Sequence, residues 1–138
     1  MKTECFLDTN VLLYAALGRK GEEAKRATAA SLIGRSVFGI STQVLQEFYT
    51  AAIRQRSGTP LSPATARRWV SDLNTQPCAV VDGALIEIAI ELSWRYRINY
   101  WDGAILAAAE RLGADVVYTE DLSHGQTYGP VRVVNPFL

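Results

Sequence analysis

Four acidic residues occupy positions where an α/β chain would place a reactive site. Asp8 directly follows the first predicted strand, and Asp121 comes shortly after the fourth predicted strand. Glu47 borders the apolar stripe of a helical pattern, and Asp102 comes three residues after Asn99, a helix-capping residue type. Carboxylates brought together repel one another, so such a cluster requires a cation or bound protons, and repulsion is expected to raise its pKa values. Because carboxylate oxygens favour Mg²⁺ or Mn²⁺, the pattern indicates a metal site made of Asp8, Glu47, Asp102 and Asp121.

Each acid also has an ordinary structural interpretation when it is taken alone. An aspartate after a strand, such as Asp8 or Asp121, is commonly a turn residue or a helix cap. Glu47 fits a solvated helix ridge, and the helix dipole is enough to explain Asp102. Only the combination of the four acids favours a site.

The chain has a single histidine, His124, which leaves too few parts for a conventional zinc site or a histidine-based mechanism. Asp121, Ser123 and His124 have the residue types of a catalytic triad. Three side chains of one short loop are badly placed for the required chain of hydrogen bonds. We therefore interpret His124 as a loop residue.

The order of apolar runs and helical patterns predicts the fold that must position the acids. Parallel strands need helical crossovers, and short apolar runs alternate with helical segments in this chain. The expected fold class is α/β, a three-layer α/β/α sandwich with a mainly parallel sheet of roughly five strands. Because the carboxyl ends of such strands meet at one edge, the acids are expected there. The pattern predicts strands at 4–7, 37–40, 78–81, 115–118 and 131–134, and helices at 11–17, 22–33, 41–56, from 63 onward, 82–97 and 99–113.

Length and composition limit the class of protein. With 138 residues, 49% hydrophobic and 20% charged, the chain suits one domain over 1–138 and is not mainly disordered. The longest apolar run, 11–17, is far too short to cross a membrane, and Asp8 comes too early for a secretory signal, so no membrane association is predicted. Cys5 and Cys78 lie in apolar runs without CxxC spacing, which fits buried thiols in a cytoplasmic protein.

Fourteen basic and fourteen acidic residues argue against a broad electrostatic grip on nucleic acid. The charges are nevertheless separated: residues 1–71 have ten Lys or Arg against five Asp or Glu, and residues 72–138 have four against nine. An anionic partner is expected to meet the acid-free stretch between 48 and 71, and an ordinary solvated helix face is the alternative. The candidate contacts for such a partner are Arg54, Arg56, Arg67 and Arg68.

Five segments resemble PIN-domain ribonucleases in order and spacing over nearly the whole chain. Single motifs of this kind are weak, whereas several in order are specific. In size the chain is similar to the VapC-type toxins of bacterial and archaeal toxin–antitoxin pairs. The segments are residues 6–10 (FLDTN), 46–48 (QEF), 100–109 (YWDGAILAAA), 119–126 (TEDLSHGQ) and 133–137 (VVNPF).

The resemblance implies an endoribonuclease in which water activated on Mg²⁺ or Mn²⁺ hydrolyses RNA phosphodiester bonds. Its implied partners are the RNA substrate, a cognate antitoxin protein that inhibits it, and a second copy of the chain in a homodimer. The arginines named above become candidate RNA or antitoxin contacts. The resemblance also implies that Asn10 and Thr119 orient the catalytic, metal-binding acids, which are Asp8, Glu47, Asp102 and Asp121.

Gly103 departs from the alanine that commonly follows the third acid of the family pattern. Glycine costs helix stability because it loses the most backbone freedom on folding. The first turn of this helix, and with it the placement of Asp102, is therefore expected to be looser.

Two other functions remain open from the residues. A haloacid dehalogenase-like phosphatase also has an aspartate after its first strand and uses Mg²⁺, but it needs a second acid two residues later, where this chain has Asn10. A non-catalytic α/β binding module would use the acidic rim to contact a partner. Retention of all four acids favours the nuclease.

Overall fold

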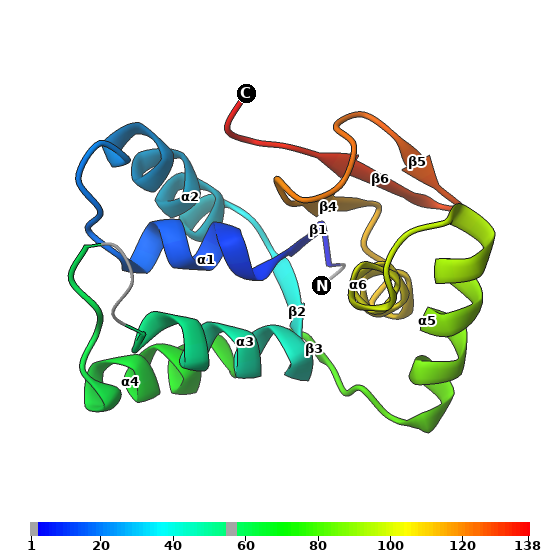
Figure 1. Cartoon of the computed structure of the whole chain (residues 1–138), viewed down its shortest axis with the longest axis horizontal. Coiled ribbons are helices and arrows are strands. Elements are labelled where there is room, and N and C mark those ends of the chain that lie inside the picture. Colours follow the sequence, from blue (N-terminus) through cyan, green and yellow to red (C-terminus); the bar gives the residue numbers. More distant parts are fainter. Residues whose placement is uncertain (1–2, 55–57) are drawn as a thin grey trace.

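A six-stranded sheet runs through the centre of the molecule and has helices on both faces (Figure 1). The computed structural model describes residues 3–54 and 58–138. Neighbouring strands pair in parallel except for the antiparallel pair of β5 and β6, so the predicted α/β sandwich with a mainly parallel sheet is confirmed. The strand order is β3-β2-β1-β4-β6-β5, formed by β1 (Cys5–Leu7), β2 (Phe38–Ser41), β3 (Cys78–Ala79), β4 (Val116–Tyr118), β5 (Thr127–Tyr128) and β6 (Val131–Val134).

The central strand β1 sets the position of the first acid. Its three residues are buried, because helices cover both faces of a parallel sheet. The register pairs Leu7 of β1 with Tyr118 of β4, and the backbone N–H of Asp8 donates to the Tyr118 carbonyl at 3.1 Å. The residues that follow these two strands, Asp8 and Thr119, are therefore neighbours in space.

The sheet has one strand more than the sequence predicts. β5 is two residues long and pairs antiparallel with the start of β6, where Tyr128 lies opposite Val131. The two strands are joined by a tight turn in which Gly129 has a φ of 59°, a conformation that favours glycine. A strand of two residues is too short to show an alternating pattern in the sequence.

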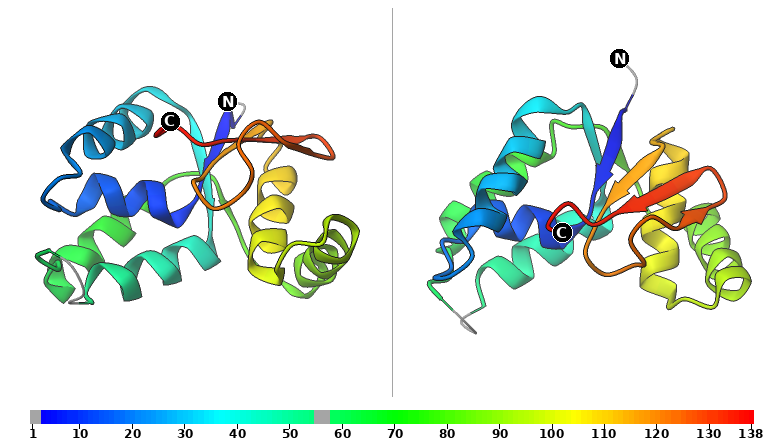
Figure 2. Two further views of the ribbon diagram at one scale, coloured as in Figure 1. Left: turned by 45° about the horizontal axis from the view of Figure 1, so that its top comes forward. Right: turned by 90° about the horizontal axis from the view of Figure 1, so that it is seen from above.

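The helices of the described residues form the two outer layers of the sandwich. Four of them cover one face of the sheet and α5 and α6 cover the other, an arrangement that Figure 2 shows from two further directions. The helices are α1 (Thr9–Ala16), α2 (Glu23–Arg35), α3 (Thr42–Ala52), α4 (Pro63–Leu73), α5 (Gly83–Tyr96) and α6 (Tyr100–Arg111).

Polar side chains begin most of these helices by accepting a hydrogen bond from a free backbone N–H of the first turn. Several helix ends differ from the sequence prediction by one to four residues. α2 continues through Gly34 to Arg35, and α3 ends at Ala52 rather than at 56, with residues 55–57 outside the described part of the chain. The capping residues are Asp8, Ser41, Ser62, Asp82 and Asn99.

Both cysteines are free thiols, with Cys5 buried beneath the helices and Cys78 half-buried. Over the ranges 3–54 and 58–138, none of the helices has the length and apolar character needed to cross a membrane.

The helix that carries Asp102 is the most deeply buried one. Every residue of α6 from Gly103 to Ala109 is buried, because this helix packs against α5 on one side and against the sheet on the other. Small side chains make such two-sided packing possible, since they let neighbouring backbones approach closely. α6 is therefore a rigid support for the acid at its first turn.

Gly103 is the point of closest approach between α5 and α6. A Cβ atom at this position would lie 2.5 Å from the carbonyl oxygen of Ala89 in α5, well inside van der Waals contact. The obstacle is backbone, which cannot move aside as a flexible side chain does. This contact is the physical reason for glycine at 103, and it ties α6 to α5 instead of loosening it as the sequence suggests.

We predict that Gly103→Ala destabilises the protein by about 1–3 kcal/mol, although alanine has the higher helix propensity, because the added methyl group forces α6 away from α5. The matched control is Gly34→Ala, at an exposed helical position where an added Cβ meets nothing within 4 Å, and it should stabilise by about 0.5–1 kcal/mol. Urea unfolding curves of the two variants measure both effects. Two stabilised proteins would contradict the packing argument.

Candidate functional site

The four predicted acids line one open pocket of about 550 Å³ at the carboxyl edge of the sheet. Asp8 and Asp121 follow the adjacent parallel strands β1 and β4, while Glu47 comes from α3, the helix directly after β2. Asp102 reaches the same pocket from the first turn of α6. Four segments that are distant in sequence therefore meet, as the topology of a parallel sheet requires.

Asp8 is a buried carboxylate with a hydrogen-bond donor on each oxygen. The Thr119 hydroxyl donates to Oδ2 at 2.8 Å, and the backbone N–H of Thr9 donates to Oδ1 at 2.7 Å. The Thr119 oxygen in turn accepts from the backbone N–H of Asp121 at 3.1 Å. Thr119 is itself fully buried, so it joins two of the acids through a single fixed hydroxyl.

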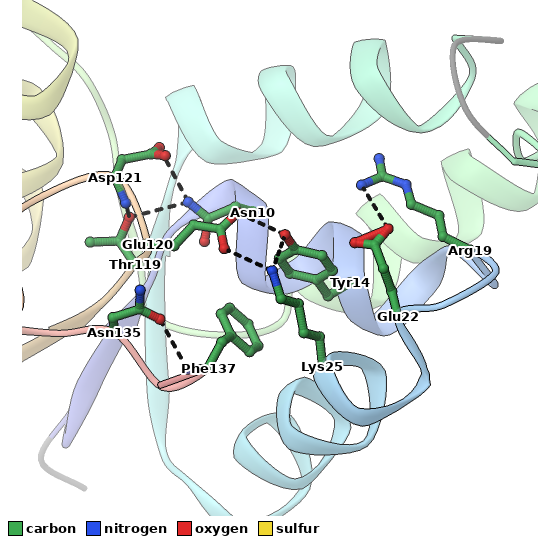
Figure 3. A network of polar contacts seen from close by, with 10 residues as sticks. All are labelled: Asn10, Tyr14, Arg19, Glu22, Lys25, Thr119, Glu120, Asp121, Asn135 and Phe137. Atoms are coloured by element: carbon green, nitrogen blue, oxygen red, sulfur yellow. Dashed lines mark hydrogen bonds and ion pairs between the residues drawn. The ribbon is translucent and has the colours of Figure 1, made fainter.

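Asn10 of α1 contacts Asp121 and also Thr119, the residue that donates to Asp8 (Figure 3). Its Nδ2 lies 3.2 Å from both the Thr119 hydroxyl oxygen and Asp121 Oδ2 and can donate to each. Its Oδ1 is buried and has no hydrogen-bond partner among the residues that the structure describes. Asn10 and Thr119 thus stand where the sequence resemblance expects orienting residues.

The other two acids have positioning partners that the sequence analysis did not name for this role. The Thr9 hydroxyl donates to Glu47 Oε1 at 3.0 Å, and Asn99 Nδ2 donates to Asp102 Oδ2 at 2.8 Å. Asn99 also accepts from the Asp102 backbone N–H, so the pair forms a reciprocal cap. The spacing of a capping residue and an acid three positions later was a usable signal for Asn99. Thr9 had none, because its contact depends on tertiary structure.

The loop that carries Asp121 is also held by its neighbour Glu120 (Figure 3). Glu120 accepts a hydrogen bond from the Tyr14 hydroxyl of α1 at 2.8 Å and lies 3.5 Å from Lys25 Nζ of α2. Lys25 also donates to the Tyr14 oxygen, and the Phe137 ring packs edge-on against Tyr14 with 4.8 Å between centroids. Glu120 and Asp121 therefore fix this loop to α1 at two adjacent points.

Burial dominates the electrostatics of the pocket. Desolvation raises the pKa of Asp8 to about 6, the hydrogen bonds from Thr119 and Thr9 oppose it, and the charges of Asp121 and Glu47 add to the rise. Burial also raises the pKa of Asp102, with a further contribution from the charge of Asp121. The sequence predicts that repulsion raises these pKa values, whereas in the folded protein desolvation is the larger cause.

The donor chemistry of the pocket fits a hard divalent cation. Carboxylate oxygens suit Mg²⁺ or Mn²⁺, and Asn10 Oδ1 adds a buried acceptor oxygen without a partner in the described ranges. Within residues 3–54 and 58–138, no three His, Cys, Asp or Glu side chains already have the arrangement of a metal centre. A bound cation would have to draw the carboxylates together or keep several of its own waters, as Mg²⁺ usually does.

The predicted arginines do not form one surface at the pocket. Arg54 lines the acidic pocket, whereas Arg67 and Arg68 are exposed on α4 and line two other surface pockets. Arg56 lies outside the described residues. His124 is a loop residue whose Nδ1 accepts from the Asn135 backbone N–H. Of these groups, the structure places only Arg54 beside the acids.

Comparison with known proteins identifies the family of this chain. The PIN domain family matches residues 5–129. The chain belongs to the PIN domain family. This membership confirms the resemblance noted in the sequence. A comparison with curated proteins found no match.

Solved structures share the fold of this PIN domain at low sequence identity. VapC20 of Mycobacterium tuberculosis, described as a toxin that cleaves the sarcin-ricin loop, is 23% identical, with 86% of this chain and 90% of that chain covered and a TM-score of 0.62. A toxin–antitoxin complex from Klebsiella pneumoniae is 18% identical, with coverage of 96% and 98% and a TM-score of 0.70. FitAcB from Neisseria gonorrhoeae is 18% identical, with coverage of 96% and 98% and a TM-score of 0.63.

The raised pKa of Asp8 predicts how the stability of the metal-free PIN domain depends on pH. The folded protein holds this proton up to about pH 6, whereas the unfolded chain loses it near its ordinary value of 3.8. The stabilising contribution is therefore complete below pH 4 and is lost as the pH rises through 6. This loss amounts to about 3 kcal/mol of unfolding free energy. In EDTA, Asp8→Asn should become more stable relative to wild type as the pH rises from 4 to 7.

Asp82→Asn is the matched control, because Asp82 also caps a helix but Arg111 lowers its pKa. The difference in unfolding free energy between this variant and wild type should stay constant between pH 5 and 7 and change only as the pH falls below 4. Urea unfolding across this pH range measures both differences. A constant difference for Asp8→Asn as well would show that the buried carboxylate does not take up a proton.

Proposed function

We propose that this PIN domain is a Mg²⁺- or Mn²⁺-dependent endoribonuclease and the toxin of a toxin–antitoxin pair. The observation that carries the proposal is the pocket in which Asp8, Glu47, Asp102 and Asp121 converge. Each of these carboxylates accepts a hydrogen bond from a neighbouring side chain, so their oxygens are oriented before any ligand binds. Such preorganised oxygens suit a cation that binds phosphate.

When bound, the metal ion supplies an activated water and stabilises the leaving oxygen of the phosphodiester. The protein then needs no nucleophile of its own, in agreement with a pocket lined by acids, amides and threonines. The four acids would hold the ion, and Thr119, Asn10, Thr9 and Asn99 would keep them in place. Arg54, in the same pocket, is positioned to attract the phosphate backbone.

The charge of the rest of the chain suits an RNA substrate. Apart from the four proposed ligands, ten acids remain against fourteen Lys or Arg, so a metal-loaded pocket would lie in a protein of net positive charge. VapC20, which has a similar fold and is described as a toxin that cleaves the sarcin-ricin loop, supports RNA as the substrate class. Asn10 donates to Asp121 and offers no general acid, which argues against the phosphatase alternative.

We expect the purified protein to cleave RNA in Mg²⁺ or Mn²⁺ and to stop when EDTA is added. Asp8→Asn and Asp102→Asn should each lower the cleavage rate at least about a hundredfold, because each removes a charge that the cation needs. A gel assay with fluorescent RNA measures the rates.

Asp72→Asn is the matched control, an exposed aspartate of α4 that does not line the acidic pocket, and its rate should remain near that of wild type. Cleavage that persists in chelator would disprove the metal mechanism. Equal losses in all three variants would indicate damage to the fold, and a folded protein without cleavage would favour a non-catalytic binding module.

We further propose that a cognate antitoxin covers the pocket in the cytoplasm, and that the PIN domain forms a homodimer. Toxin–antitoxin complexes among the similar solved structures support such a partner. A basic side chain of the inhibitor would gain a favourable charge pairing with the acids, because the pocket is partly desolvated.

Expression of the chain alone should slow bacterial growth, and co-expression of the neighbouring open reading frame should restore it. Expression of Asp102→Asn alone controls for a burden unrelated to the acids, because this variant should not be toxic. Growth curves and co-purification measure rescue and binding, and sedimentation measures the homodimer. A neighbour that neither binds nor rescues would contradict the toxin assignment while leaving the nuclease proposal intact.

A further inference from the structure

A second hollow of about 280 Å³ adjoins the acidic pocket. It is formed by one residue of α6 and by the side of α3 that faces it, and it shares all but one of its lining residues with the acidic pocket. The shared residues are Gln43, Glu47, Thr50 and Trp101. Any group bound in this second hollow therefore lies directly beside whatever the acids hold. The lining residues are Gln43, Gln46, Glu47, Thr50 and Trp101.

Trp101 is an exposed aromatic side chain on a fixed support. It lies immediately before Asp102 in the buried helix α6, yet it is 62% exposed. The Tyr100 ring contacts it edge-on at 5.0 Å between centroids, and the Gln43 amide donates to its backbone carbonyl at 3.4 Å. A single ring in a T-shaped pair can cover at most one face of the indole, so the other face of this exposed side chain stays accessible. A large, rigid π surface is thus presented at the mouth of the acidic pocket.

Gln46 supplies the polar part of the same hollow. It is exposed on α3, and its side chain makes no hydrogen bond to any residue that the structure describes. An amide has both donors and an acceptor, so it can pair with the edge of a nucleobase. Gln43, in contrast, is buried and directed to Trp101 and Glu47.

We propose that Trp101 and Gln46 form a subsite for one unpaired nucleobase of the RNA, next to the phosphate held at the acids. This inference rests on the proposed nuclease function and adds to it the residues that hold a base beside the cleaved bond. Stacking on aromatic side chains is a general mode of single-strand recognition, because every base has a π face. A base within a duplex is already stacked and cannot occupy the hollow.

The charges around the hollow favour a nucleotide over an apolar peptide as its occupant. Arg54 and the proposed cation site lie in the adjoining pocket, where they would hold the phosphates on either side of the stacked base. Glu47, one of the residues that line both pockets, accepts a hydrogen bond from Thr9. The base and the phosphate of one nucleotide are covalently linked, so two pockets that share lining residues can hold both.

Binding of uncleaved RNA tests this subsite. The background is Asp8→Asn with Mg²⁺ present, in which the RNA should stay intact on a gel. Fluorescence anisotropy then gives Kd for a labelled single-stranded oligoribonucleotide and for a blunt duplex. Trp101→Ala should weaken single-strand binding about tenfold or more, because stacking of one base is lost. Trp101→Phe should remain within about threefold of the parent, and duplex binding should not change with either variant.

Trp94→Ala is the matched control, because Trp94 is 77% exposed on α5 and lines neither pocket. Its Kd for single-stranded RNA should equal that of the parent. Gln46→Ala should reduce the differences in affinity among oligo(A), oligo(C) and oligo(U) without abolishing binding. Calorimetry of Mg²⁺ binding to wild type and to Trp101→Ala should give equal affinities, which excludes an indirect effect through Asp102.

Three results would overturn the subsite. Equal Kd values for Trp101→Ala and Trp94→Ala would show that no base stacks on Trp101, while Mg²⁺-dependent cleavage by wild type would leave the proposed function standing. Weaker Mg²⁺ binding in Trp101→Ala would assign Trp101 to the placement of Asp102. A changed sedimentation coefficient with unchanged RNA affinity would place Trp101 in a protein interface. Absence of both RNA binding and cleavage in the folded protein would reject the proposed function itself.

Discussion

A carboxylate buried at the end of the central strand is the constraint on which the rest of the site depends. Asp8 is 6% exposed, so its charge cannot be solvated by water and must be stabilised by the protein, by a proton or by a cation. Thr119 supplies one hydrogen bond, and its own position follows from the pairing of β1 with β4. The sheet register, the buried hydroxyl and the acid thus form one unit, in which a change to any part alters the others.

Asp8 has two roles that reinforce each other. It caps α1 through the backbone N–H of Thr9, and it faces the pocket with the remaining acceptor positions of its oxygens. The same helix carries Asn10, which donates to Asp121, and Tyr14, which donates to Glu120. These two hydrogen bonds hold the loop after β4 against α1. This short helix therefore contacts three of the four carboxylates, Asp8 and Glu47 through Thr9 and Asp121 through Asn10.

The opposite wall of the pocket is built by a different principle. α6 is buried between α5 and the sheet because its side chains are small. Gly103 has no side chain, which lets its backbone lie against the Ala89 carbonyl. That packing holds the first turn of the helix still, with Asp102 capped by Asn99 on one side and Trp101 exposed beside it. A rigid helix end can thus carry both a carboxylate directed at the acidic pocket and an aromatic surface at its mouth.

The sequence by itself determined the alternation of strands and helices, most of the helix caps and the four acids, because these depend on local periodicity and on the chemistry of single residues. The two-residue strand β5, the contact of Thr9 with Glu47 and the close approach at Gly103 depended on tertiary structure. Burial also decided the pKa of Asp8, which repulsion between charges explains only in part.

The arginines show the same division, because their number is evident in the sequence, but only the packing of α3 and α4 places Arg54 at the pocket and Arg67 and Arg68 elsewhere. Contacts between residues distant in the chain have no local pattern, and desolvation exists only once the chain has folded around a group.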